Sequence, residues 1–259
     1  NSGHFKVIED TVLDVKNIDS DYVFDCRGKP KDYSDYDELI NPTNACILAQ
    51  ANWDTSQAYW SRHVATPDGW TFVIPTLKDS PSRSGGVGYC YNSNITSKED
   101  AEKNMLDMFD VEITTHINYK NYVARNPIVD DRIFLNGNRL FFLEPLESTA
   151  AQAYVECARY FVDYIITKKE PVEQAAHAAK QYIRQLQNFV LWHYQFGSKY
   201  DTPFWNYAKK LSFRDKTFDA MVEYCKQTTN RDILPKAYGG ATSEASQYGQ
   251  WPANSFKIW

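Results

Sequence analysis

The feature that most constrains the fold is a change of hydrophobic pattern near residue 148. Before it, short apolar and β-branched runs alternate with turn-forming residues, which is typical of strands in an antiparallel sheet. After it, apolar residues recur at three- and four-residue spacing, which is typical of helices packed on one face. Because strands and helices are segregated along the chain, the sequence predicts an α+β fold, with a mainly antiparallel sheet segment followed by a helical part.

The boundaries of the expected elements follow from the apolar runs and from the residues that stop them. The expected strands are 5–8, 12–15, 22–24, 45–51, 70–74, 87–91, 113–123 and 132–135, with a Gly85-Gly86 turn ahead of 87–91. The expected helices are 98 to about 109 after a capping box at 97–100, then 150–166, 171–196 opened by Pro171, 205–211 and 218–226. The tail from Leu234 is expected to be irregular.

Charge and cysteine usage narrow the function classes. The net charge is −5 and no stretch gathers Lys and Arg into a stripe, which argues against nucleic acid as a partner. No run approaches the roughly eighteen apolar residues of a membrane span. The five cysteines and five histidines lack zinc-ligand spacing, so we expect no metal site and a reducing, cytoplasmic setting. The aromatic content of 15% suits either a core or a pocket for a planar ligand.

The stretch 141–149, F-F-L-E-P-L-E-S-T, carries the chemistry. Glu144 and Glu147 stand in apolar surroundings just ahead of an expected helix, and burial would raise a carboxyl pKa into the range useful for proton transfer. Ser148 and Thr149 are candidate N-caps, and the free amides of the next turn form a small anion site. From the residues alone, the pattern favours a capped helix preceded by a solvated glutamate over such a site.

This stretch, preceded by F-L-N-G at 134–137, resembles the L-E-P-L-E-S-T hallmark of the flavin-dependent tryptophan halogenase family. Further matches occur in the family's order over about residues 20–210: D-C-x-G at 25–28, G-W-x-W-x-I-P at 69–75, G-Y-x-Y-S at 88–93, L-x-H-Y at 191–194 and D-T-P-Y-W at 201–205. Phe72 replaces the second tryptophan of its signature.

The resemblance implies a flavin monooxygenase-like two-domain fold that halogenates tryptophan or an indole-like aromatic with reduced FAD, oxygen and halide. Residues 1–148 would be the sheet-rich part of the flavin domain and 149–259 the helical substrate-binding part, both incomplete. The implied site residues are Glu147 and Ser148 for catalysis, Thr149 and Ala150 for halide, Trp70, Phe72, Ile74 and Pro75 for the wall between flavin and substrate, Gly137 and Leu146 for cofactor, and Tyr248 and Trp251 for substrate.

The sequence departs from the family at its ends. It contains no G-x-G-x-x-G, and the family's catalytic lysine lies amino-terminal to anything present, so we expect a missing N-terminal segment and an inactive isolated chain. The expected partners are a flavin reductase, a small aromatic substrate and a second copy in a homodimer. Two alternatives remain: a flavin monooxygenase that hydroxylates its substrate, and a non-catalytic remnant that binds an aromatic ligand.

Overall fold

The fold is given by a computed structural model that describes residues 4–56, 61–76, 84–168, 171–214 and 216–228. The described helices are α1 (Lys98–Met108), α2 (Thr149–Thr167), α3 (Val172–Phe196), α4 (Pro203–Ser212) and α5 (Lys216–Thr228), with short 3₁₀ helices η1 (Val15–Asn17), η2 (Gly137–Arg139) and η3 (Leu146–Ser148). The strands are β1 (Val23–Asp25), β2 (Tyr36–Glu38), β3 (Ala45–Asp54), β4 (Arg62–Thr66), β5 (Gly69–Ile74), β6 (Ser84–Tyr91), β7 (Val111–Asn118), β8 (Tyr122–Ala124), β9 (Ile128–Val129), β10 (Ile133–Leu135) and β11 (Phe141–Phe142).

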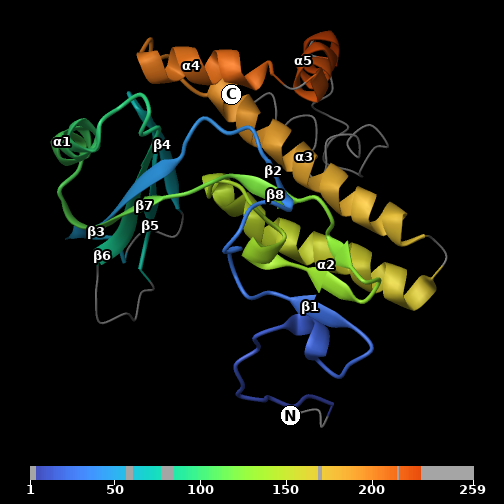
Figure 1. The fold of residues 1–259 in the computed structure, drawn as a ribbon. Helices are drawn as coiled ribbons and strands as arrows, with labels where there is room; N and C mark the ends of the chain where they lie inside the picture. Colours follow the sequence, from blue (N-terminus) through green and yellow to red (C-terminus); the bar gives the residue numbers. More distant parts are fainter. Residues whose placement is uncertain (1–3, 57–60, 77–83, 169–170, 215, 229–259) are drawn as a thin grey trace.

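A five-stranded antiparallel sheet with the strand order β4-β5-β6-β3-β7 forms the largest β layer. Figure 1 shows α1 on one side of this sheet and the pair α2 and α3 on the other. The α+β expectation is therefore confirmed, and the predicted strands 45–51, 70–74 and 87–91 fall within β3, β5 and β6.

Each face of the sheet packs against a different helical partner, because successive side chains of a strand point to opposite faces. On β3, Ala45 and Ile47 pack in a cluster with Ala101 and Met105 of α1. The neighbouring Cys46 lies in a second, larger cluster that contains residues of α2 and α3. A one-residue slip of β3 would exchange these faces, so the two-sided burial fixes the register.

Two small sheets join the large sheet to the helices. In the first, β1 and β10 run parallel, with Asp25 opposite Leu135, and β9 pairs antiparallel with β10. In the second, the order is β11-β8-β2 and both pairs are antiparallel. The Phe134 ring of β10 lies 5.3 Å from the Phe161 ring of α2, so the parallel pair is packed directly on the helical layer.

The helical layer follows the predicted spacing. Tyr182, Leu186, Phe189, Val190 and His193 of α3 are all buried, as their three- and four-residue spacing indicates. The α1 capping box is also confirmed, because Ser97 accepts from the backbone N–H of Asp100 and donates to its carboxylate. Helix α4 is tied to the β4–β5 hairpin through two side-chain hydrogen bonds to backbone carbonyls, from Trp205 to Thr66 and from Thr202 to Pro67.

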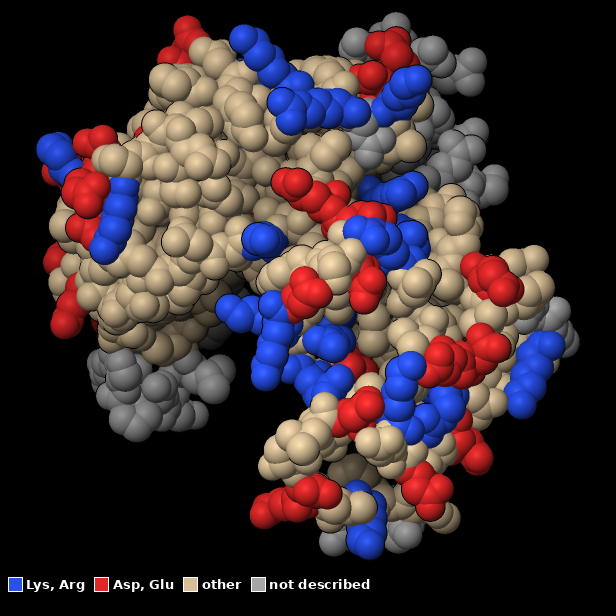
Figure 2. Space-filling view, viewed as in Figure 1, with Lys and Arg blue, Asp and Glu red and all other residues tan. Residues whose placement is uncertain are grey.

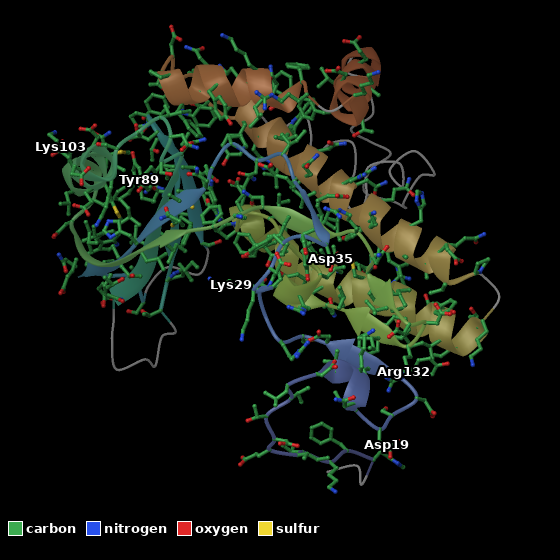
Figure 3. All side chains as sticks on the ribbon, viewed as in Figure 1. Asp19, Lys29, Asp35, Tyr89, Lys103 and Arg132 are labelled. Carbon is green, nitrogen blue, oxygen red and sulfur yellow. The ribbon has the colours of Figure 1, made fainter. Side chains whose placement is uncertain are left out.

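Several expected elements were wrong. Residues 5–8 and 12–14 are exposed and form no strand, and Val15 is half-buried and begins η1. Arg132 holds the following segment by donating to the carbonyls of Ile18 and Ser20 (Figure 3). The expected strand 113–123 is divided into β7 and β8. Gly85 and Gly86 lie within β6 and form no turn, and Pro171 is the N-cap of α3 instead of its first residue.

The surface of the described residues carries both signs of charge. On the face drawn in Figure 2, Lys and Arg side chains are interspersed with Asp and Glu. Within the described ranges, no helix combines the length and the apolar run that crossing a bilayer requires.

Candidate active site

The motif segment leaves the small β11 strand, passes through Pro145 into η3, and continues as α2. Leu143 and Leu146 are buried in the larger core cluster, so they hold the segment in place. Ser148 has φ 55°, a left-handed conformation that costs a non-glycine residue about 1 kcal/mol or more. A strained residue held by buried neighbours is typical of a functional turn.

Glu144 is the fully buried carboxyl of this segment. Tyr194 of α3 donates its hydroxyl to both carboxylate oxygens, at 2.6 and 2.7 Å. Thr43, just ahead of β3, donates its hydroxyl to the Oε2 atom of Glu144. The indole N–H of Trp70 and the amide of Asn41 also face the carboxyl, although neither makes a hydrogen bond of normal geometry to it. The carboxyl therefore joins the motif to β5, α3 and the segment before β3.

Burial raises the pKa of Glu144 to about 7, although the hydrogen bonds from Thr43 and Tyr194 oppose the rise. Desolvation penalises the charged carboxylate more than two hydroxyl donors can offset. The group consequently exchanges its proton near neutral pH, which is the range that general acid–base chemistry requires.

Of the residues expected to form the wall, Trp70, Phe72 and Ile74 lie on β5 and Pro75 follows it, and they are only partly brought together. Trp70 is buried, and its ring lies 5.7 Å from that of Phe72. Phe72 covers Gly88 of the neighbouring strand, where an added Cβ would come within 2.1 Å of the ring, so a side chain at position 88 would displace the Phe72 ring. Ile74 is 53% exposed, and Pro75 is half-buried beyond the strand end.

Trp70 and Leu146 line one apolar pocket, together with His63, His193, Tyr194 and Trp205. This pocket lies where the wall strand, the motif segment and helices α3 and α4 meet. Its volume of about 60 Å³ is well below the roughly 300 Å³ of a typical ligand pocket, so an indole-sized ring enters only if lining side chains rotate.

The start of α2 carries the expected halide-binding residues. The N–H of Thr149 donates to the carbonyl of Leu146, whereas the amides of Ala150 and the next residues have no acceptor within α2. The N-cap residue Ser148 makes no side-chain hydrogen bond to this helix end, and among the described side chains the buried hydroxyl of Thr149 has no partner. A positive helix terminus beside an unpartnered buried hydroxyl is suited to a small anion.

The carboxyl ends of β1 and β10 form a second polar edge. Asp25 is buried and paired with Arg27 at 2.9 Å and Arg139 at 3.3 Å. Desolvation would raise the pKa of Asp25, but hydrogen bonds from Arg27 and the charges of both arginines lower it below its usual value. Gly28 and Gly137 follow the two strands with positive φ, and a Cβ at either would meet nothing within 4 Å. Ligands of parallel sheets bind at such an edge.

The sequence pointed to this segment without singling out Glu144 as its buried acid. It assigned catalysis to Glu147, whose side chain lies outside the described part of the structure, as do Tyr248 and Trp251. Glu144 was recognised only as one of two carboxylates, and its partners Thr43 and Tyr194 were not connected to it. The apolar run F-F-L directly before Glu144 was the available signal for its burial.

A family model described as tryptophan halogenase matches residues 12–255. Tryptophan 6-halogenase ThaL of Streptomyces albogriseolus is 27% identical over 207 residues, which cover 77% of this chain and 36% of that protein. Tryptophan 7-halogenase RebH of Lentzea aerocolonigenes is 26% identical over 162 residues, or 59% of this chain and 29% of that protein.

Solved structures show the same fold. The tryptophan halogenase of Shewanella frigidimarina superposes with a TM-score of 0.69 at 18% identity, covering 92% of this chain and 46% of that one. MibH, a tryptophan 5-halogenase, superposes with a TM-score of 0.65 at 21% identity, covering 83% of this chain and 43% of that one. The chain thus spans about a third of the curated relatives and less than half of these two structures.

Proposed function

We propose, from the premise that this chain belongs to the tryptophan halogenase family, that it forms part of a flavin-dependent halogenase acting on tryptophan or a similar indole. The observation that carries the proposal is the meeting of Trp70 and Leu146 in one apolar pocket beside the α2 terminus. In this proposal the wall, the motif and the anion-binding helix end share one region, as the family's chemistry requires.

In this proposal Glu147 accepts the proton from the aromatic ring, and Ser148 holds the turn in its left-handed conformation beside it. Ala150 binds the halide through its backbone amide at the helix terminus, and Thr149 contributes its hydroxyl, because its own N–H donates to the Leu146 carbonyl. Trp70, Phe72, Ile74 and Pro75 separate the flavin from the substrate. Tyr248 and Trp251 contact the substrate.

The edge formed by β1 and β10 fits one side of FAD, because the open space above Gly28 and Gly137 admits a ligand close to the backbone. Gly137 and Leu146 would lie against the cofactor, and Leu146 also lines the apolar pocket. When bound, reduced FAD and oxygen supply the oxidising power that turns halide into an electrophilic halogen. Arg27 and Arg139 remain paired with Asp25, so they shape this edge instead of offering free charges.

The proposal includes a flavin reductase as electron source, a homodimer and a cytoplasmic location. Cys26, Cys46, Cys90 and Cys157 are free thiols, which suits a reducing compartment.

The test assays the complete gene product with a flavin reductase, bromide or chloride, and tryptophan or indole. Glu147→Gln should abolish the halogenated product while flavin oxidation continues, because the variant loses only the proton acceptor at the ring. Glu112→Gln, at an exposed site on β7, is the matched control and should halogenate normally. Full halogenation by Glu147→Gln, or loss of flavin oxidation, would contradict the assigned role; hydroxylated product would instead indicate a monooxygenase.

Halide binding has its own test. Thr149→Val keeps the side-chain shape and removes the buried hydroxyl. If this hydroxyl faces the halide, the KM for halide should rise about tenfold, the worth of one hydrogen bond to an ion, with kcat at saturating halide retained. An unchanged KM would remove Thr149 from the halide site.

A further inference from the structure

A chain of hydrogen bonds passes through the core beside the motif. The Tyr119 hydroxyl donates to the Thr43 hydroxyl at 2.7 Å. Thr43 in turn donates to Glu144, and Tyr194 donates to Glu144 from the opposite side. We call these four residues the Glu144 chain.

The two ends of the Glu144 chain lie at different cavities. Tyr119 and Thr43 line a polar cavity of about 380 Å³, which is also lined by Asn41, Asn44, Asn121 and Lys120. Tyr194 lines the apolar pocket with Trp70 and Leu146. The chain therefore connects a polar cavity with the apolar pocket, which is where we place the aromatic ring once the lining side chains rotate.

We propose that the Glu144 chain is a proton relay that carries the proton released at the aromatic ring to the polar cavity. The proposal rests on the proposed function, because replacing a ring hydrogen by halogen releases one proton that must leave an apolar pocket. Glu144 is the store in the middle of the relay, and Thr43 and Tyr119 are its outlet.

The transfer balances at each step. Tyr194 passes its hydroxyl proton to the Glu144 carboxylate and takes up the ring proton that Glu147, the acceptor in the proposed function, releases into the apolar pocket. After the hydroxyl groups rotate, Glu144 donates to Thr43, Thr43 passes its own proton to Tyr119, and Tyr119 releases one proton into the polar cavity. No electron moves, and each residue regains its original number of protons.

The groups facing Glu144 leave the stored proton on the carboxyl. The titratable neighbours are the thiol of Cys90 and the phenols of Tyr119 and Tyr194. Burial raises the pKa of Cys90, Tyr119 and Tyr194 well above their usual values, so these three stay neutral at neutral pH. A purely structural carboxyl would make the same contacts, so the test must follow the proton itself.

The kinetic test compares Tyr119→Phe and Thr43→Val with Tyr122→Phe in the complete gene product. Tyr122 lines the same polar cavity, but its hydroxyl donates to the Asn138 carbonyl and lies outside the chain. Breaking the outlet should lower kcat for halogenation about tenfold or more at unchanged substrate KM, and Thr43→Ser should restore it. Equal rates for Tyr119→Phe and the Tyr122→Phe control would overturn the relay.

An infrared test does not depend on halogenation. The wild-type protein should show a protonated-carboxyl band that disappears as pH rises through neutrality and is missing in Glu144→Gln. After mixing with D₂O, the band should shift more slowly in Tyr119→Phe than in Tyr122→Phe. If halogenation is not observed but this exchange pattern holds, the proposed function fails and the proton path stands. A missing band, or equal exchange in both tyrosine variants, rejects the path whatever the activity.

Discussion

Replacing Glu144 by Gln should change how the stability of the protein depends on pH. The pKa of the Glu144 carboxyl is about 7 in the folded protein against 4.5 for an unperturbed glutamate. Between these two values the folded state binds more protons than the unfolded state, so the free energy of unfolding falls as pH rises through this window. Below pH 4.5 both states are protonated, and above pH 7 the full penalty of the buried charge applies.

The size of the effect follows from the same two values. Folding raises the pKa of this carboxyl from 4.5 to about 7, and each pKa unit is worth about 1.36 kcal/mol. The free energy of unfolding of the wild-type protein should therefore fall by about 3 kcal/mol between pH 4.5 and pH 8. Glutamine has the same shape and stays neutral at every pH, so it does not carry this penalty. Relative to wild type, Glu144→Gln should therefore gain about 3 kcal/mol across that range.

Urea denaturation followed by tryptophan fluorescence, repeated at several pH values, measures this difference. All other titrating groups are shared by the two proteins, so their contributions cancel in the comparison. Glu112→Gln, with its exposed side chain, should show a nearly constant difference from wild type. If the Glu144→Gln difference is equally constant, the carboxyl is not buried as described, and the arguments for its protonation near neutrality fail.

Further substitutions test individual contacts of the fold. Gly88→Ala should destabilise the protein by about 2 kcal/mol, because the Phe72 ring must move. Adding Phe72→Leu should recover part of this loss, which a double-mutant cycle of unfolding free energies measures. Asp25→Asn should lower the free energy of unfolding by about 2 kcal/mol at pH 7, because it weakens the hydrogen bonds from Arg27. The difference from wild type should shrink below the usual aspartate pKa, which urea denaturation at several pH values measures. Ser97→Ala should remove the α1 cap and cost about 1 kcal/mol in thermal unfolding.

Local patterns were sufficient to predict the helices. The apolar spacing of α3 identified its buried face, and the side chain of Ser97 marked the start of α1. Both features depend on residues three or four positions apart, so they can be recognised without knowing the rest of the fold.

Strand prediction failed where pairing depended on distant segments. Residues 5–8 have strand-like composition, but within the described ranges no other strand pairs with them. The expected strand 113–123 breaks near Tyr119, whose backbone N–H donates to the Asn44 carbonyl while its hydroxyl reaches Thr43. β-propensity reports whether a residue fits a half-buried surface, and it contains no information about which partner is present.

The buried acid was missed for the same reason. Glu144 and Glu147 have similar local sequence surroundings. The hydroxyls that donate hydrogen bonds to Glu144, however, belong to Thr43, 101 residues earlier, and Tyr194, 50 residues later. Only the assembled fold brings these hydroxyls to one point. The motif was therefore recognisable from sequence, whereas the division of roles between its two carboxylates was not.

The hydrogen bonds of Glu144 also bear on how Glu147 can work. Two carboxylates that share one site raise each other's pKa and titrate as a coupled pair. The carboxyl of Glu144 is held by Thr43 and by two contacts from Tyr194, so its oxygens are committed to partners outside the motif. A direct shared proton between the two glutamates would require breaking these bonds inside the core. The motif can thus present one glutamate to the substrate while the other, three residues earlier, exchanges protons with a separate set of hydroxyls.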